Sequence, residues 1–262
     1  MNRKLRHFLF GSAAAAGAAA CVAVCAALFS SAYETGARAA SSGSVQTGSL
    51  VSSGRASSVQ AVSPVKKETE GVRPEAERAR ELVLVNGDNP LPAWFKLNLT
   101  ESFGQRMDEA AAEAFVSMKT DASRDGVSLW VSSAYRSGEL QGELYRREIE
   151  ECAKTCATYG DAEALAQRSV APPGCSEYET GLALDLNGAR GDFETSAAFR
   201  WLGLHAQDYG FILRCPKDKQ DVTKVGYEPW HYRYVGVADA QAMKKAGLCL
   251  EEYAPQKTGA VH

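Results

Sequence analysis

The chain has 262 residues, a net charge of -3 and 23% charged residues, a balance that gives no sign of a polyanion-binding surface and so argues against nucleic acid as a partner. Seven cysteines are present, and no pair has the Cys-x-x-Cys spacing of a structural zinc knuckle. Five of them follow residue 150, so at least one thiol there stays unpaired within the chain.

The first 33 residues predict export. Three cations within the first six residues precede residues 8–32, which carry no charge and are rich in Ala, Val and Leu. Such a stretch is long enough to span a bilayer as a helix, and its basic flank places the rest of the chain outside the cytoplasm. We expect residues 1–33 to be a membrane anchor or a signal peptide, with cleavage positions after Ala32 and Ala39. Lipoprotein processing at a cysteine of this stretch is a further alternative.

Residues 34–72 predict a flexible linker. They are mostly Ser, Gly, Ala, Val and Gln followed by a charged run, and such a segment buries too little apolar surface to fold. The remainder is long enough for one hydrophobic core. We therefore expect a single globular domain at residues 73–255 and a short tail at residues 256–262.

Within residues 73–255 the apolar pattern predicts both helices and strands. Strands are expected at residues 82–85, 127–134, 211–213 and 231–235. Helices are expected at residues 75–81, directly after Pro74, and at residues 109–119, 137–149, 193–209 and 238–245. Strands and helices do not alternate as βαβ units, which favours an α+β fold with a small, mostly antiparallel sheet and helices packed on it.

Three polar residues stand out within apolar or aromatic runs. Asp185 lies inside Leu-Ala-Leu-Asp-Leu, where a carboxylate is costly unless it is paired or binds a metal. His231 follows Glu228 by three residues in an aromatic stretch. An imidazole, a carboxylate and a second carboxylate as base are what a catalytic zinc site needs. Taken alone, an Asp and a His so far apart in sequence are more typical of an ion pair or a packed core histidine.

Three motifs in order change that interpretation. They are Ser-Ala-Tyr-Arg-Ser at residues 133–137, Ser-Glu-Tyr-Glu-Thr-Gly-Leu-Ala-Leu-Asp at residues 176–185, and Glu-Pro-Trp-His at residues 228–231. Together they resemble the VanY-type D-alanyl-D-alanine carboxypeptidases, a zinc metallopeptidase family with an α+β fold. The family pattern is Ser-x-Tyr-Arg-Ser, Ser-x-His-x-x-Gly-x-Ala-x-Asp and Glu-x-Trp-His. The resemblance covers residues 82–255.

The resemblance also implies roles for individual residues. Asp185 and His231 would bind zinc, and Glu228 would be the general base that takes a proton from the attacking water. Arg136 would bind the substrate carboxylate or the developing oxyanion, because a guanidinium matches such groups. Two further residues are expected to line the substrate pocket: Ser176 and Gln141.

The departure from the family pattern is Tyr178, where the family has a histidine ligand. We place Tyr178 as the third zinc ligand, which requires the metal to draw off a phenol proton. Alternatives are a water in its place, the nearby thiol of Cys175, or a site without metal. His205 is expected to pack in its helix, and Cys152 and Cys156 lie one helical turn apart, so a disulfide between them is conceivable.

The expected function is an exported zinc carboxypeptidase that hydrolyses the terminal D-alanyl bond of peptidoglycan stem peptides. The expected location is extracytoplasmic, with the protein tethered to the membrane by its N-terminal segment or secreted. The alternative is a catalytically inactive module that binds the cell wall and keeps the peptidase fold, a reading that rests on Tyr178 alone.

Overall fold

A computed structural model of the chain describes residues 74–258. The predicted anchor or signal peptide (residues 1–33) and the predicted linker (residues 34–72) lie outside the described residues, as do residues 259–262 of the tail. Among residues 74–258, no helix is both long enough and apolar enough to cross a membrane.

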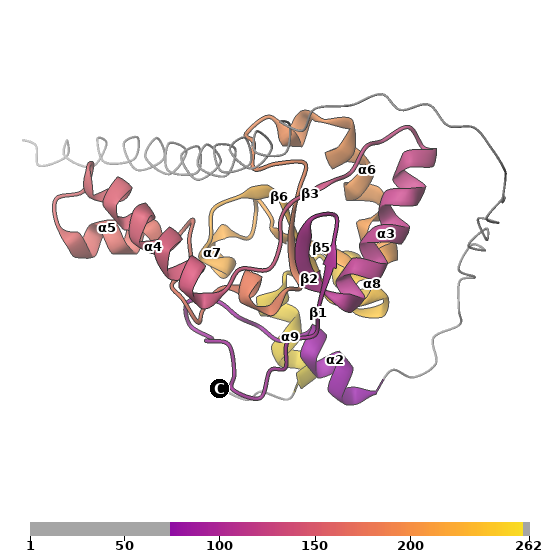
Figure 1. Ribbon diagram of the computed structural model, residues 1–262, viewed down its shortest axis with the longest axis horizontal. Helices are drawn as coiled ribbons and strands as arrows, with labels where there is room; N and C mark the ends of the chain where they lie inside the picture. The colour runs from indigo at the N-terminus through magenta and orange to yellow at the C-terminus, as the bar shows by residue number, and fades with distance from the viewer. Residues whose placement is uncertain (1–73, 259–262) are drawn as a thin grey trace, which may run out of the picture.

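A four-stranded sheet lies at the centre of the described residues (Figure 1). Its strands are β3 (Val131–Ser133), β4 (Ala183–Leu186), β5 (Phe211–Cys215) and β6 (Glu228–Tyr234). The order is β3-β4-β6-β5, and every neighbouring pair is antiparallel. All residues of the two central strands, β4 and β6, are buried. This small antiparallel sheet with helices around it confirms the predicted α+β class.

A two-stranded hairpin that the sequence pattern did not predict precedes the first long helix. It joins β1 (Leu99–Ser102) to β2 (Gln105–Asp108). Its turn residues, Phe103 and Gly104, have φ angles of 53° and 72°. Two consecutive positive φ angles are required by a type I′ turn, for which Asn-Gly is the usual sequence signal. A phenylalanine in the first turn position gave no such signal.

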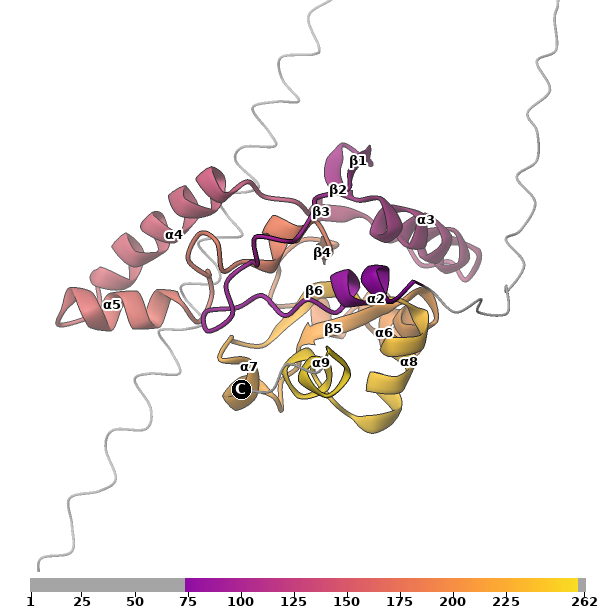
Figure 2. The same ribbon diagram turned by 90° about the horizontal axis from the view of Figure 1, so that it is seen from below.

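Helices surround the sheet, and α4 and α5 project together to one side of it (Figure 2). The helices are α2 (Glu75–Glu81), α3 (Glu109–Arg124), α4 (Gly138–Ala153), α5 (Tyr159–Ala166), α6 (Ala197–His205), α7 (Gln220–Thr223), α8 (Val237–Ala246) and α9 (Leu250–Thr258). The short 3-10 helices are η1 (Glu177–Thr180), η2 (Phe193–Thr195) and η3 (Ala206–Tyr209). Helices α2, α3, α4 and α8 confirm predictions, whereas α5, α7 and α9 were not predicted.

Two sequence-based predictions of secondary structure are wrong. Residues 82–85 form no strand, although Leu82, Val83 and Val85 are buried as a strand would be. The predicted helix at residues 193–209 is divided into η2, α6 and η3, because Ser196 has an extended backbone and its side chain caps α6 by accepting from the Phe199 amide. Gly210 ends η3 in the left-handed conformation, as expected of a C-cap.

Gly181 fixes the approach of the motif loop to the hairpin. It ends η1 with a φ of 76°, a conformation that side chains with a Cβ rarely adopt. A Cβ at this position would lie 2.6 Å from Leu99 Cδ2 and 2.9 Å from the backbone nitrogen of Asp108. Glycine therefore allows η1, which carries Tyr178, to pass directly against β1 and β2.

Candidate active site

Asp185 and His231 are brought together by strand pairing. Asp185 lies on β4 and His231 on β6, and the antiparallel register places the two residues directly opposite one another. Side chains in such pairs begin about 4.5–5.5 Å apart at their Cβ atoms. Both side chains are buried. The sheet thus joins two predicted ligands that are far apart in the sequence.

Tyr178 reaches the same point from η1. Its hydroxyl donates to Asp185 Oδ1 at 2.6 Å and lies 3.3 Å from His231 Nδ1. Ligand atoms held tetrahedrally at about 2.0–2.1 Å from zinc lie roughly 3.3 Å from one another. The distance from Tyr178 to His231 has this value, and the distance from Tyr178 to Asp185 would have to lengthen by roughly 0.7 Å. Tyr178 and His231 thus have the spacing of two ligands of one small divalent cation, and Asp185 lies next to Tyr178 on the same side.

Glu228, the predicted base, lies next to His231 at the start of β6. Its Oε2 atom is 2.8 Å from His231 Nδ1, a hydrogen bond in the tautomer that carries the Nδ1 proton. On the other side of the ring, His231 Nε2 is 3.4 Å from Glu177 Oε1, but the contact lacks hydrogen-bond geometry. The imidazole thus lies between two buried carboxylates.

Burial and neighbouring charges raise the pKa values of Tyr178, Asp185 and His231. Burial raises the pKa of Tyr178 well above its usual value, and the charge of Asp185 raises it further. Burial also raises the pKa of Asp185, although the charge of His231 opposes the effect. Burial alone would lower the pKa of His231, but the hydrogen bond with Glu228 and the charge of Glu177 raise it. A cation that binds here therefore has to displace protons.

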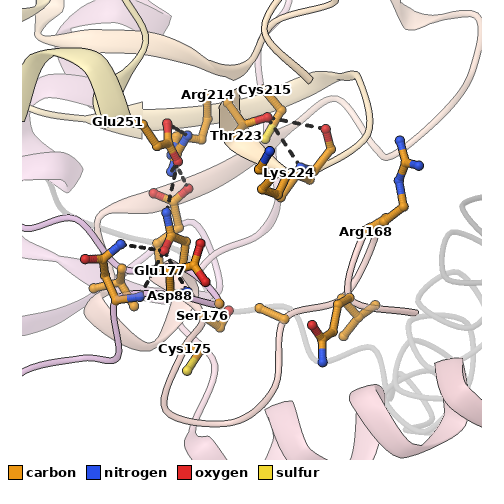
Figure 3. Close-up of a pocket in the computed structure, with 18 of the residues that line it drawn as sticks. Asp88, Arg168, Cys175, Ser176, Glu177, Arg214, Cys215, Thr223, Lys224 and Glu251 are labelled. Atoms are coloured by element: carbon orange, nitrogen blue, oxygen red, sulfur yellow. Dashed lines mark hydrogen bonds and ion pairs between the residues drawn. The ribbon is translucent and has the colours of Figure 1, made fainter. Parts of the chain in front are cut away.

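Glu177 is held in place by two buried arginines, Arg214 and Arg233. Arg233 Nη1 donates to Glu177 Oε2 at 2.8 Å, and Arg214 Nε lies 2.8 Å from Glu177 Oε1. Arg214 also donates twice to Glu251, at 3.0 and 2.7 Å (Figure 3). Burial would raise the pKa of Glu177, but the two guanidinium charges outweigh it and lower that pKa. The carboxylate beside His231 Nε2 therefore stays ionised.

Arg136 lies over the ring of Tyr178. Its guanidinium carbon lies 3.7 Å from the centroid of the Tyr178 ring, and Nη2 is 3.5 Å from Asp185 Oδ2. Nε and Nη2 both donate to Ser133 Oγ, at 3.3 and 3.2 Å. These contacts hold the guanidinium at the pocket, where it can bind a carboxylate or an oxyanion.

A pocket of about 720 Å³ opens beside these groups. Its lining includes the predicted site residues Arg136, Gln141, Ser176, Tyr178, Glu228 and His231, but not Asp185. Gln141 is buried and donates from Nε2 to the Ala171 carbonyl at 2.7 Å, whereas its Oε1 has no partner among the described residues. A buried acceptor left unpaired costs about 1–3 kcal/mol, so Oε1 is a natural partner for a substrate N–H.

The other cysteines and the histidine considered from the sequence lie in different parts of the fold. Cys175 lines the pocket but lies apart from Cys215, which no sequence motif includes (Figure 3). His205 packs against the Trp201 ring, with centroids 4.6 Å apart, in keeping with the expected packing role. No disulfide joins Cys152 to Cys156 in the described part of the chain.

Comparison with known proteins gives a consistent family. Residues 104–237 match the VanY family model, D-alanyl-D-alanine carboxypeptidase. A D-alanyl-D-alanine carboxypeptidase of Enterococcus faecalis is 41% identical over 179 residues, which are 68% of this chain and 66% of that protein. A mutant of the vancomycin resistance D,D-pentapeptidase VanY, solved in complex with Zn(II), is 40% identical with a TM-score of 0.60. VanYB in complex with D-alanine-D-alanine is 39% identical, also with a TM-score of 0.60.

The extent of these matches differs between whole proteins and solved domains. The chain spans 43–66% of the length of three curated relatives. Each of the two solved structures matches 66% of this chain, and the match includes 98% of the first structure and 96% of the second. The family match at residues 104–237 contains all three sequence motifs, and this chain belongs to the VanY family of D-alanyl-D-alanine carboxypeptidases.

Proposed function

We propose that the protein is an exported, zinc-dependent carboxypeptidase that removes the terminal D-alanine from peptidoglycan stem peptides. The observation that carries this proposal is the convergence of Tyr178, Asp185 and His231 on one point, with Glu228 hydrogen-bonded beside them. The Zn(II) and D-alanine-D-alanine complexes of the two solved relatives support the same metal and the same substrate class.

The residues of the chain divide the chemistry among them. Asp185, His231 and Tyr178 would hold zinc, which supplies a Lewis acid and lowers the pKa of a bound water to about 7. Glu228 accepts a proton as water attacks the peptide carbonyl and delivers it to the leaving amine of D-alanine. Arg136 binds the terminal carboxylate or the oxyanion.

Two further residues orient the peptide. Gln141 Oε1, which has no partner among the described residues, accepts a substrate N–H. Ser176 is buried in the pocket lining next to η1 and offers a hydroxyl to the peptide backbone. Both lie on the same pocket as Arg136, so the peptide end is held by several groups at once.

The direct test is release of free D-alanine from a stem pentapeptide that ends in D-Ala-D-Ala. The purified protein should release D-alanine, a chelator should abolish the reaction, and added zinc should restore it. A stem tetrapeptide with a single terminal D-alanine, incubated in parallel, distinguishes the two bond types. Zinc-loaded protein that cleaves neither peptide would overturn the proposal.

The second candidate function is an inactive module that binds the cell wall. It is favoured by one observation, the tyrosine at position 178 where the family pattern has a histidine, because a neutral phenol is a poor zinc ligand. This reading predicts pentapeptide binding to the same pocket with no D-alanine release, even in excess zinc. Equilibrium binding of the peptide, measured beside the hydrolysis assay, separates the two functions.

We also propose that the domain lies outside the cytoplasm, tethered to the membrane by residues 1–33 or secreted after their removal. The uncharged residues 8–32 behind a basic start support this topology. Protease added to wall-less but intact cells, or to their medium, should digest the protein. If the protein is protected until the membrane is broken, the proposed topology is wrong.

A further inference from the structure

The imidazole of His231 has a different carboxylate on each side of its ring. Nδ1 lies 3.3 Å from the Tyr178 hydroxyl, at the proposed metal position, and 2.8 Å from Glu228 Oε2. Nε2 points the other way, to Glu177 Oε1 at 3.4 Å. A nitrogen that binds a metal needs a free lone pair, so the proton of the neutral ring must lie on Nε2 when Nδ1 is the ligand. The hydrogen bond with Glu228 favours the opposite tautomer, and the Glu177 side has to outweigh it.

The Oε1 atom of Glu177 faces two buried nitrogens that need an acceptor. They are His231 Nε2 and Arg214 Nε, the latter at 2.8 Å. Three buried side-chain atoms among residues 74–258 have no hydrogen-bond partner, and these two nitrogens are among them. Buried polar atoms in native folds are nearly always hydrogen-bonded, and a carboxylate oxygen has lone pairs for both donors. Glu177 is therefore the acceptor toward which the Nε2 proton of His231 is directed.

The backbone places Glu177 against this nitrogen from two directions. Glu177 directly precedes Tyr178 in η1, so the element that carries the proposed third ligand also carries this carboxylate. Arg233 follows His231 by two residues on β6, and residues with this spacing point to the same face of a sheet. Arg233 Nη1 donates to Glu177 Oε2 at 2.8 Å and so draws the carboxylate to the face on which the imidazole lies.

We propose that Glu177 is a positioning residue for the zinc ligand His231: its carboxylate accepts the Nε2 proton, so that Nδ1 faces the metal and Glu228 is free to act as the base. Ligating histidines generally donate their second ring N–H to a carboxylate, a carbonyl or water, which fixes the tautomer and the ring orientation. Metal binding would displace a proton from Nδ1 to solvent and leave the one on Nε2. The inference deepens the proposed function and rests on it.

Nuclear magnetic resonance of the wild type tests this arrangement without any variant. The chain has four histidines, so a proton–nitrogen correlation spectrum of the full-length protein with labelled imidazoles is simple. One equivalent of zinc is added, and His231 is the ring whose signals change. We expect zinc on Nδ1 and a proton on Nε2 that is shifted far downfield by its hydrogen bond with a carboxylate. Zinc on Nε2, or an Nε2 proton without the downfield shift, would overturn the inference.

Glu177→Asp tests the residue itself. The variant keeps the negative charge between Arg214 and Arg233 but withdraws the carboxylate from Nε2 by one methylene group. We expect the downfield signal to disappear and the zinc affinity to fall by about 10–100-fold, the usual loss when the partner of a ligating histidine is removed. An aspartate variant that folds and keeps both the signal and the affinity would contradict the proposed role.

The matched control is Glu251→Gln. It removes an ion pair from the same arginine, Arg214, but Glu251 lies on α9 and is not a partner of His231 among the described residues. This variant should unfold at a lower temperature and keep the zinc affinity and the downfield signal of the wild type. An equal loss of zinc affinity in the two variants would reduce Glu177 to a structural member of the ion-pair network and overturn the inference.

Release of D-alanine is measured separately on the same zinc-loaded samples. A wild type that shows the downfield signal and releases no D-alanine refutes the proposed function alone. A wild type that releases D-alanine without the signal refutes only the role of Glu177.

Discussion

Replacing Glu228 by glutamine should lower D-alanine release by at least about a hundredfold, while the fold is retained. The amide keeps the size of the carboxylate, so the start of β6 around His231 should keep its packing. The amide cannot take up a proton from the attacking water. The loss should therefore appear in kcat, with little change in the binding of the uncleaved peptide.

A second buried carboxylate controls for the removal of charge. Glu148 on α4 is also buried, accepts from Ser169 Oγ at 2.6 Å and does not line the pocket. Glu148→Gln should keep the turnover of the wild type. Turnover that survives in Glu228→Gln, with the thermal unfolding midpoint unchanged, would remove Glu228 from the mechanism.

Tyr178→His should raise the zinc affinity by at least about tenfold and raise D-alanine release when zinc is limiting. The phenol must lose a proton to become a good ligand, and burial and Asp185 make that loss costly by raising its pKa. A neutral imidazole binds zinc without this step. Affinity is measured by competition with a coloured chelator, and turnover by D-alanine release at matched free zinc.

Two further variants identify the third ligand. If Tyr178 binds zinc, Tyr178→Phe should lose most of the zinc affinity, whereas Cys175→Ser should lose little. The opposite pattern would assign the ligand to Cys175, and no effect of either change would place water in that position. A Tyr178→His protein that binds zinc no better than the wild type would show that this residue does not limit the site.

The proposed ligands and the base came from the resemblance of the three motifs to the family pattern, since the residues alone were more typical of an ion pair or a packed histidine. The apolar run around Asp185 predicted a buried carboxylate, and the register of β4 and β6 places it opposite His231. The contacts of Glu177 could not be predicted, because Arg214 and Arg233 come from β5 and β6. Arg214 in turn is shared with Glu251 on α9. The nearness of Cys215 to Glu228 could not be predicted for the same reason: it exists only through the pairing of β5 with β6.

The wrong strand prediction at residues 82–85 has a similar physical cause. The run is apolar and buried, so its composition fits a strand. The carbonyl oxygens in this run and just before it accept hydrogen bonds from a side chain and not from a neighbouring strand. Arg233 Nη2 donates to the carbonyl oxygens of Glu81 and Val83, at 2.9 and 3.0 Å. A guanidinium thus takes the place of a neighbouring strand, and no pattern of apolar residues distinguishes the two.

This use of Arg233 sets the limits of any shortened recombinant form of the protein. The family match spans residues 104–237, but the carbonyl partners of Arg233 precede it, and Glu251, a partner of Arg214, follows it. A fragment cut at the limits of the match would leave two guanidinium groups inside the protein without these partners. Loss of Glu251 breaks its buried ion pair with Arg214. Breaking such a pair costs about 3–5 kcal/mol, a large part of the stability of an average domain. Expression limits should therefore lie before α2 and after α9.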